Sequence, residues 1–199
     1  MRTMIFMSSC VLFMAFVLHS CMQTGSSKNT AEKNTLTDAE LISRGEYLVT
    51  TIGCNDCHSP KKVTERGLEI IPELMLSGYP GDRPVPQVSA DALNSGWGLL
   101  NYDLTTFAGP WGQSFAANLT PDQTGIGNWT EEQFKKALTQ GKFKGIDGAR
   151  TLLPPMPWFN WTHMKDEDVK AIYHYLKSIP PVKNVVPAAI PPESLIASK

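Results

Sequence analysis

The stretch Gly53–Pro60 reads GCNDCHSP, with Cys54 and Cys57 three positions apart and His58 directly after the second cysteine. Residues at this spacing lie on the same face of a single helical turn, so the two thiols point the same way. The sequence contains four cysteines, and the other two lie within its first 21 residues. Cys54 and Cys57 are therefore the two cysteines available to the rest of the chain, and we expect this turn to determine which ligand it binds.

Four interpretations of the pattern make different demands on its surroundings. A thioredoxin-like redox pair requires a preceding strand within a βαβ unit, whereas the residues before Gly53 predict a helix. A zinc site requires two further ligands, yet the chain has no second cysteine pair, and His163 and His174 lack ligand spacing. A disulfide is open to two nearby cysteines in an oxidising compartment. The fourth interpretation is covalent haem attachment, for which C-x-x-C-H is the signature.

Haem attachment uses every residue of the motif. The thiols of Cys54 and Cys57 can each add to one vinyl group on the haem edge, and the imidazole of His58 then reaches the iron. Both sulfurs become thioethers, so they can no longer form a disulfide. We therefore predict one covalently bound haem c, with Cys54 and Cys57 as its attachment points and His58 as the first axial ligand.

The second axial ligand is predicted to be Met156, within the segment LLPPMPW (residues 152–158). Pro155 and Pro157 stiffen the backbone on both sides and remove amide donors, which presents the sulfur on a rigid apolar loop. The weaker candidates are Met22, Met75, Met164, His163 and His174. Ligation by His and Met raises the reduction potential relative to two imidazoles and leaves no open position for a substrate, which favours electron transfer.

Two helices are predicted to cross near the N-terminal side of the motif. The capping box TDAE precedes a helix over residues 38–51, whose apolar residues recur at helical spacing. The last helix begins at Asp166 with three acidic residues and ends at a pair of prolines. Gly45 weakens the first helix, which indicates that the last helix approaches it closely there, near Tyr173 or its neighbours.

The middle of the chain predicts one more helix and little else that is regular. A second capping box, TEEQ at residues 130–133, begins a short helix that stops at Gly141. Residues 61–129 are rich in glycine, proline and tryptophan, and we expect loops there, with one small hairpin near Tyr102–Phe107. The fold class is therefore predicted to be mostly α: three or more helices wrapped around one covalently bound haem, with long Gly/Pro-rich loops and no convincing sheet.

The N-terminus has the layout of a signal peptide, with Arg2 as its only charge and an apolar run over Val11–Leu18. The ending Leu-His-Ser-Cys resembles the lipobox of bacterial lipoproteins, in which the cysteine, here Cys21, is lipidated. We expect an exported protein, anchored by lipid to a membrane of the bacterial cell envelope or periplasm. The predicted organisation is a signal peptide over residues 1–20, a flexible tether over 21–35, a haem domain over 36–183 and a Pro-rich tail over 184–199.

Charge excludes one class of partner. The chain has 18 basic and 19 acidic residues without a basic run, so nucleic acid is not expected to bind.

The same residues resemble a known family. GEYLVTTIGCNDCH, MPW and DEDVKAIYHYLKSIPP are similar to class I c-type cytochromes. FAANLTPDQTGIGNWTEEQF and LLPPMPW resemble more closely the cytochrome c subunits of periplasmic alcohol, aldehyde or sugar-acid dehydrogenases. The resemblance implies the cytochrome c fold, haem on Cys54 and Cys57, and axial ligands His58 and Met156. The chain departs from those subunits in one respect: they carry several haem modules, and it has one C-x-x-C-H.

These expectations lead to an electron carrier rather than an enzyme. Its partners would be redox proteins, such as a dehydrogenase, an oxidase or another cytochrome, and the membrane through its lipid anchor. The alternative is a haem-containing enzyme or gas-binding sensor with an open distal site, which requires that Met156 does not bind iron. A third role, as a subunit that holds a dehydrogenase at the membrane, is compatible with electron transfer.

Overall fold

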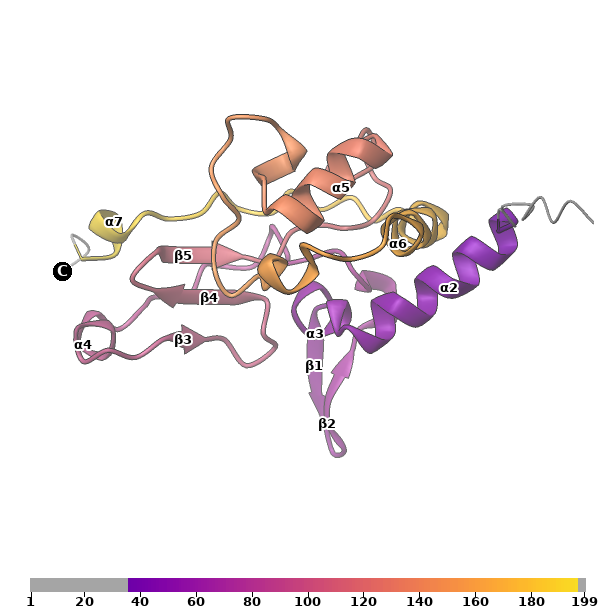
Figure 1. Ribbon diagram of the computed structural model, residues 1–199. Coiled ribbons are helices and arrows are strands. Elements are labelled where there is room, and N and C mark those ends of the chain that lie inside the picture. Colours follow the sequence, from indigo (N-terminus) through magenta and orange to yellow (C-terminus); the bar gives the residue numbers. More distant parts are fainter. Residues whose placement is uncertain (1–35, 197–199) are drawn as a thin grey trace, which may run out of the picture. The chain divides into compact units, whose positions relative to one another are not determined.

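The computed structural model describes residues 36–196 (Figure 1). The predicted signal peptide, tether and lipidated Cys21 lie outside these residues, so they stay predictions. Three longer helices occur in the described part, α2 (Asp38–Thr51), α5 (Glu131–Gln140) and α6 (Asp166–Ser178). All three were expected from the sequence. The shorter helical elements are α3 (Cys54–His58), α4 (Ala90–Asn94), α7 (Pro192–Ile196), η1 (Pro72–Leu74), η2 (Phe143–Gly145) and η3 (Trp158–Trp161).

The helices begin where their capping residues predict. The side chain of Thr37 accepts a hydrogen bond from the backbone of Glu40 at the start of α2, and the Glu40 side chain bonds back to the cap. Thr130 and Gln133 form the same reciprocal pair at the start of α5. These bonds satisfy backbone donors that a helix leaves free in its first turn.

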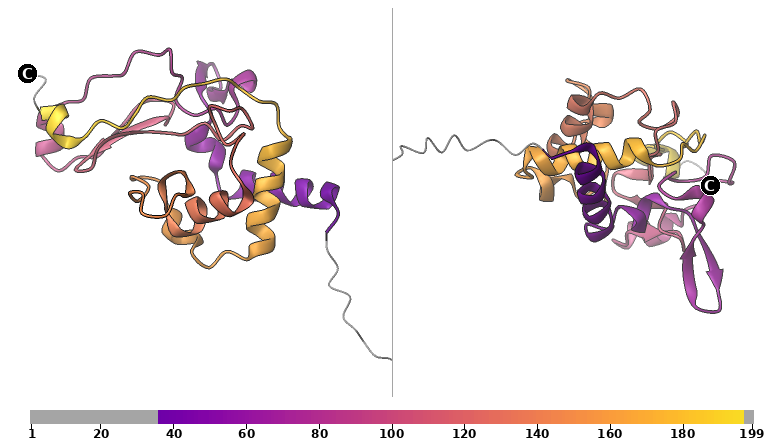
Figure 2. Two further views of the ribbon diagram at one scale, coloured as in Figure 1. Left: turned by 90° about the horizontal axis from the view of Figure 1, so that it is seen from above. Right: turned by 90° about the vertical axis from the view of Figure 1, so that its right-hand side faces the viewer.

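Helices α2 and α6 cross, as the views of Figures 1 and 2 both show, and Gly45 lies at the contact. A Cβ on Gly45 would collide with the backbone oxygen of Ala171 and would lie 2.6 Å from Cβ of Tyr175. The predicted close approach near Tyr173 is therefore confirmed, and the contact is made by Ala171 and Tyr175, each two positions from it. Arg44 and Asp168 join the helices through a hydrogen bond of 2.6 Å between Nε and Oδ1.

An apolar cluster lies between α2, α5 and α6. Its buried members are Val49, Leu76, Ile126, Phe134, Leu138, Val169, Ile172, Tyr175, Leu176 and Ile179. Helix α6 supplies four of them at helical spacing, so one face of this helix is turned inward along its whole length. Residues that follow the C-x-x-C-H motif also enter the cluster, as Leu76 and Ile126 show.

The predicted absence of a convincing sheet was wrong. Strands β1 (Lys61–Thr64) and β2 (Gly67–Ile70) form an antiparallel hairpin that projects from the body (Figure 1). Strands β3 (Leu99–Leu100), β4 (Thr106–Gly109) and β5 (Gly112–Phe115) form an antiparallel sheet in that order. The hairpin expected near Tyr102–Phe107 corresponds to the β3–β4 connection. Strands of two to four residues are too short to show a period of two in the sequence.

The C-terminal segment is hydrogen-bonded to the rest of the described chain. The side chain of Asn184 donates to the backbone oxygens of Ser77 and Tyr79 and accepts from the backbone of Gly81. Ile190 pairs with Gln113 of β5 through two backbone hydrogen bonds, beyond which α7 begins. None of the helices between residues 36 and 196 combines the length and apolar character needed to cross a bilayer.

Candidate functional site

The C-x-x-C-H motif forms a single helical turn, α3, directly after α2 (Figure 1). Gly53 separates the two helices with φ of 77°, a left-handed conformation that glycine adopts without steric cost. Cys54 and Cys57 are both half-buried on this turn and both are free thiols. The structure therefore contains the one-turn arrangement that the motif predicts, and it does not contain the alternative disulfide.

His58 is buried and held through one of its ring nitrogens. Its Nδ1 lies 2.7 Å from the backbone oxygen of Ala117. Because a carbonyl oxygen only accepts, Nδ1 must carry the proton, which leaves the lone pair on Nε2. Burial lowers the pKa of His58, although the bond to Ala117 opposes this, so the neutral imidazole is favoured. A histidine fixed through one nitrogen with a free pair on the other is the form that ligates a metal.

Two residues that follow η1, Leu76 and Gly78, hydrogen-bond to the C-terminal end of the motif. Gly78 donates its N–H to the backbone oxygen of His58 at 2.7 Å, and Leu76 donates to the Ser59 hydroxyl at 2.8 Å. Leu76 is buried and has φ of 59°, a conformation that costs a branched residue energy and persists where its surroundings enforce it. Its carbonyl accepts from Leu119, so the same short segment binds both the motif and the loop that follows Ala117.

The loop over residues 118–127 is rigid because buried polar groups bond it on two sides. The side-chain oxygen of Asn118 accepts from the backbone and the hydroxyl of Thr120, while its amide donates to the carbonyl of Val182 at 2.8 Å. Lys177 on α6 donates to the carbonyl of Gly127 at 2.5 Å. Ala117, whose oxygen orients His58, directly precedes this loop, and its role was not predicted from the sequence.

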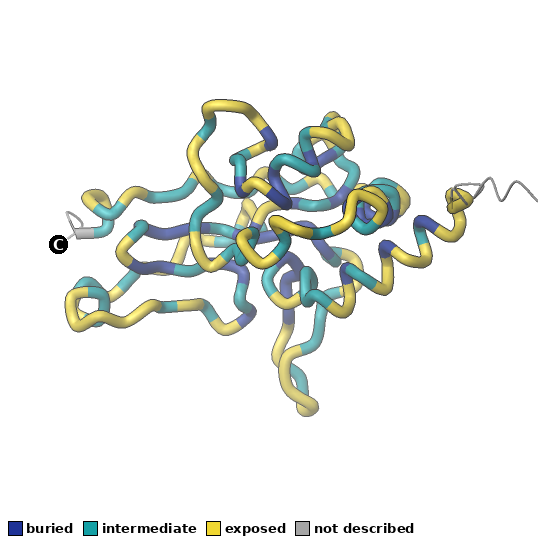
Figure 3. The backbone as a smooth tube through the Cα atoms, in the orientation of Figure 1, coloured by how far each residue is buried: buried dark blue, intermediate teal, exposed yellow. Residues whose placement is uncertain are grey.

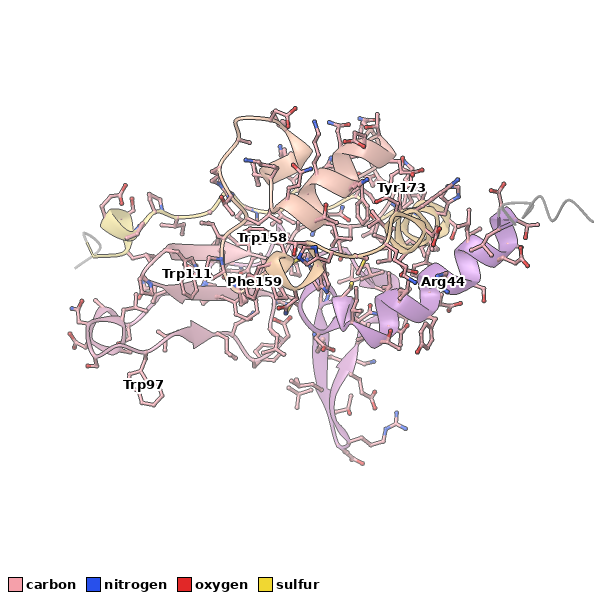
Figure 4. The ribbon with its side chains drawn as sticks, in the orientation of Figure 1. Arg44, Trp97, Trp111, Trp158, Phe159 and Tyr173 are labelled. Carbon is pink, nitrogen blue, oxygen red and sulfur yellow. The ribbon has the colours of Figure 1, made fainter. Side chains whose placement is uncertain are left out.

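Met156 lies on a loop that is fixed at both ends. The backbone of Leu152 donates to the carbonyl of Gly141, where α5 ends, and the Ser114 hydroxyl of β5 donates to the carbonyl of Pro154 at 2.7 Å. The ring of Trp158, labelled in Figure 4, packs on Gly141 so closely that a Cβ there would collide with it. The rigid presentation predicted for this segment is therefore supported by its contacts.

Met156 and Cys54 contact the same apolar cluster. Both are half-buried and pack against it, although about a hundred positions separate them in the sequence. Met75 and Met164 also pack against the cluster, which gives each an ordinary packing role. Of the histidine candidates, His163 is exposed, and His174 lies 3.9 Å from Oδ1 of Asp38.

The two thiols lie in surroundings that disfavour their ionisation. Burial raises the pKa of Cys54 to about 12 and also raises that of Cys57. Among residues 36–196, no three His, Cys, Asp or Glu side chains are gathered as a metal ion would require.

A buried charge cluster behind the motif was not found by sequence reasoning. The Lys61 ammonium is bonded to backbone oxygens of the motif, and Asp103, which is fully buried, pairs with Arg83. Lys61 begins an exposed hairpin and Asp103 lies in a loop, so neither position carries a periodic signal. We name Lys61, Asp103 and Arg83 the charge cluster.

The chain is similar to cytochrome c subunits of dehydrogenases. It is 33% identical over 136 residues to the fructose dehydrogenase cytochrome subunit of Gluconobacter japonicus, and 31% identical over 136 residues to the gluconate 2-dehydrogenase cytochrome c subunit of Pantoea cypripedii. It is 31% identical over 147 residues to the alcohol dehydrogenase (quinone) cytochrome c subunit of Gluconobacter oxydans. These alignments cover 68%, 68% and 73% of this chain.

The same alignments span only 20%, 22% and 23% of the length of those relatives. The predicted resemblance to dehydrogenase cytochrome subunits is confirmed over most of the chain. No protein-family model matches it.

The residues present fit a covalently bound haem c. Two neutral thiols on one turn match the two vinyl groups, and the adjacent imidazole keeps its Nε2 lone pair free. The apolar cluster beside Cys54 and Met156 provides the dry, low-dielectric wall that a haem requires.

Proposed function

We propose that this chain is a one-haem c-type cytochrome that carries electrons, with His58 and Met156 as the two axial ligands. The observation that carries the proposal is the buried imidazole of His58, fixed by Ala117 through Nδ1 and placed one residue after a pair of neutral thiols. When bound, the haem supplies one-electron exchange between the ferric and ferrous states.

The protein's residues would do three things for that exchange. Cys54 and Cys57 attach the group covalently, and Ala117 fixes the orientation and tautomer of His58. Met156, on its doubly anchored loop, would close the second axial position. A closed coordination sphere leaves no place for a substrate, so the role supported best is that of a carrier rather than an enzyme.

The proposal extends to location and partners. Export to the bacterial cell envelope and lipid attachment at Cys21 are supported by the signal-like N-terminus and its Leu-His-Ser-Cys ending. Donor and acceptor would be redox proteins, and the similarity to dehydrogenase cytochrome subunits favours a dehydrogenase as the donor. Labelling with a fatty-acid analogue should mark the wild-type protein and leave a Cys21→Ser variant unlabelled.

The ligand assignment is tested with a matched pair of methionines. Met156 and Met75 are both half-buried and both pack against the apolar cluster. Met156→Ala should lower the reduction potential and let the ferrous protein bind carbon monoxide, whereas Met75→Ala should do neither. A Met156→Ala protein with wild-type potential and spectrum would contradict the assignment. Rapid binding of carbon monoxide to the wild type would instead favour the open-site alternative.

A further inference from the structure

Lys61 is a buried cation bonded directly to the haem-attachment turn. Its side chain belongs to a residue that is only 9% exposed, at the start of the hairpin β1–β2. The Nζ atom lies 2.7 Å from the backbone oxygen of Asp56, 2.9 Å from that of Ser59 and 3.0 Å from that of Asp103. Asn55 contributes a fourth, longer contact at 3.4 Å.

The contacts show that this side chain is protonated. An ammonium group has three N–H donors and no acceptor, and the three short contacts all end on carbonyl oxygens, which only accept. A neutral amine would direct its lone pair at one of them. Burial lowers the pKa of Lys61, whereas the nearby Asp103 opposes this change and the three carbonyl oxygens favour the ammonium form.

Two of these oxygens belong to α3 itself. The carbonyls in the last turn of a helix have no partner within the helix and form its negative end, where a cation is stabilising. Lys61 therefore stabilises the C-terminal end of α3 by donating to the carbonyls of Asp56 and Asn55.

The charge cluster as a whole is positive. The carboxylate of Asp103 is fully buried and accepts from Arg83 at 2.7 Å, from Asn101 at 2.6 Å and from the Thr105 hydroxyl at 2.7 Å. Arg83 thus balances Asp103, and the charge of Lys61 is left over. Asp56 is also near, but its side chain is exposed and water screens it.

We propose that Lys61 is a positioning and tuning residue of the haem site: it holds the Cys54–His58 turn against the β3–β4 connection and, against the turn whose His58 would ligate the iron, it places a positive charge that Asp103 does not balance. This inference rests on the proposed function. A fixed positive charge opposes the gain of charge when iron is oxidised, so it stabilises the ferrous state and raises the reduction potential.

The chain provides a matched control in the next residue. Lys62 lies on the opposite face of the same strand and is exposed. Lys61→Met and Lys62→Met remove the same formal charge, and only the first removes it from a buried position. A difference between the two variants therefore reports the buried charge and not the net charge of the protein.

The experiment is a spectroscopic redox titration of the haem-loaded full chain. Lys61→Met should lower the ferrous-to-ferric ratio at a fixed ambient potential by roughly tenfold, about 59 mV for one electron. Lys62→Met should change it by less than about twofold, because exposed charges are screened. Lys61→Arg keeps the charge and should retain most of the wild-type value.

Asp103→Asn provides a test of opposite sign. It removes the negative charge and keeps the size of the side chain, so the ferrous-to-ferric ratio at a fixed ambient potential should rise. If Lys61 and Asp103 had only structural roles, Lys61→Met and Asp103→Asn would not shift the reduction potential in opposite directions. If Lys61→Met yields no haem-containing protein, Asp103→Asn decides: a raised ratio supports the inference, and an unchanged or lowered ratio overturns it.

The inference is also overturned if Lys61→Met and Lys62→Met share the wild-type potential while both carry covalent haem. That result leaves the proposed function intact. The proposed function fails separately, if the wild-type chain itself acquires no covalent haem.

Discussion

The helical part of the molecule and the part between His58 and Trp129 are stabilised in different ways. Helices α2, α5 and α6 meet through apolar side chains, while the strands and loops are built around buried polar ones. Buried positions occur in both parts (Figure 3). The buried polar residues of this second part are Ser59, Lys61, Ser77, Asp103, Thr105, Thr106, Gln113, Ser114, Asn118 and Thr120.

The two parts should differ in how well they tolerate substitutions. Apolar packing is non-directional and loses energy in proportion to the atoms removed, whereas a buried polar network fails when one member leaves the others unpaired. The polar part should therefore be the less tolerant of the two, and it is the part that orients His58.

Asp103→Ala is expected to have the largest effect. It leaves the guanidinium of Arg83 without its buried anion, and breaking one partner from a buried ion pair costs about 3–5 kcal/mol. The free energy of unfolding in urea measures this loss. Asp82→Ala removes an exposed carboxylate from the same region and should cost less than about 0.5 kcal/mol. Equal losses in the two variants would contradict the role given to the charge cluster.

Ile172→Ala tests the helical part. The side chain is 1% exposed within the apolar cluster, so its removal should cost about 3 kcal/mol through lost burial and a cavity. The same urea titration reports it, with Lys170→Ala on the exposed side of α6 as the control. A cost below about 1 kcal/mol would show that the crossing of α2 and α6 is not tightly packed.

Asn118→Ala should destabilise the polar part by about 2 kcal/mol, because three hydrogen bonds to Thr120 and Val182 lose their partner. Loosening of this loop should also perturb His58 through Ala117, which would appear as a change in the haem absorption spectrum. Asn128→Ala, an exposed asparagine just beyond the loop, should leave both stability and spectrum unchanged. If the spectrum of Asn118→Ala is unaltered, Asn118 stabilises the loop without affecting the orientation of His58.

Thr130→Ala is expected to have the smallest effect, about 1 kcal/mol, since it removes only the N-cap of α5. Thr130→Ser keeps the capping oxygen and should restore most of the stability. Identical losses in both variants would mean that the methyl group and not the capping oxygen stabilises the helix start.

The helical part could be predicted from the sequence more fully than the part built around buried polar residues. The starts of α2 and α5 follow from Thr37 and Thr130, and the crossing at Gly45 follows from a glycine inside an otherwise apolar helical face. The role of the Cys54–His58 turn could be predicted because the spacing C-x-x-C-H is the signature of covalent haem attachment. The strands could not be predicted because two to four residues are too short to show a period of two. The hydrogen bond from His58 to Ala117 could not, because the two residues lie far apart in sequence.

Lys61 is the clearest example of a residue whose burial the sequence does not predict. A lysine at the start of a short polar strand predicts an exposed side chain, and its neighbour Lys62 is indeed exposed. Only the folded chain brings the carbonyls of Asp56 and Asp103 together around its ammonium group.

The proposed function requires that Cys54 and Cys57 hold a haem that His58 ligates. The most direct test is haem staining of the full chain after denaturing electrophoresis, following expression with a complete cytochrome c maturation apparatus. We predict that the wild-type band retains its haem, and that a Cys54→Ala, Cys57→Ala double variant retains none. A wild-type band without stain, or a haem that denaturation extracts from it, would contradict the claim.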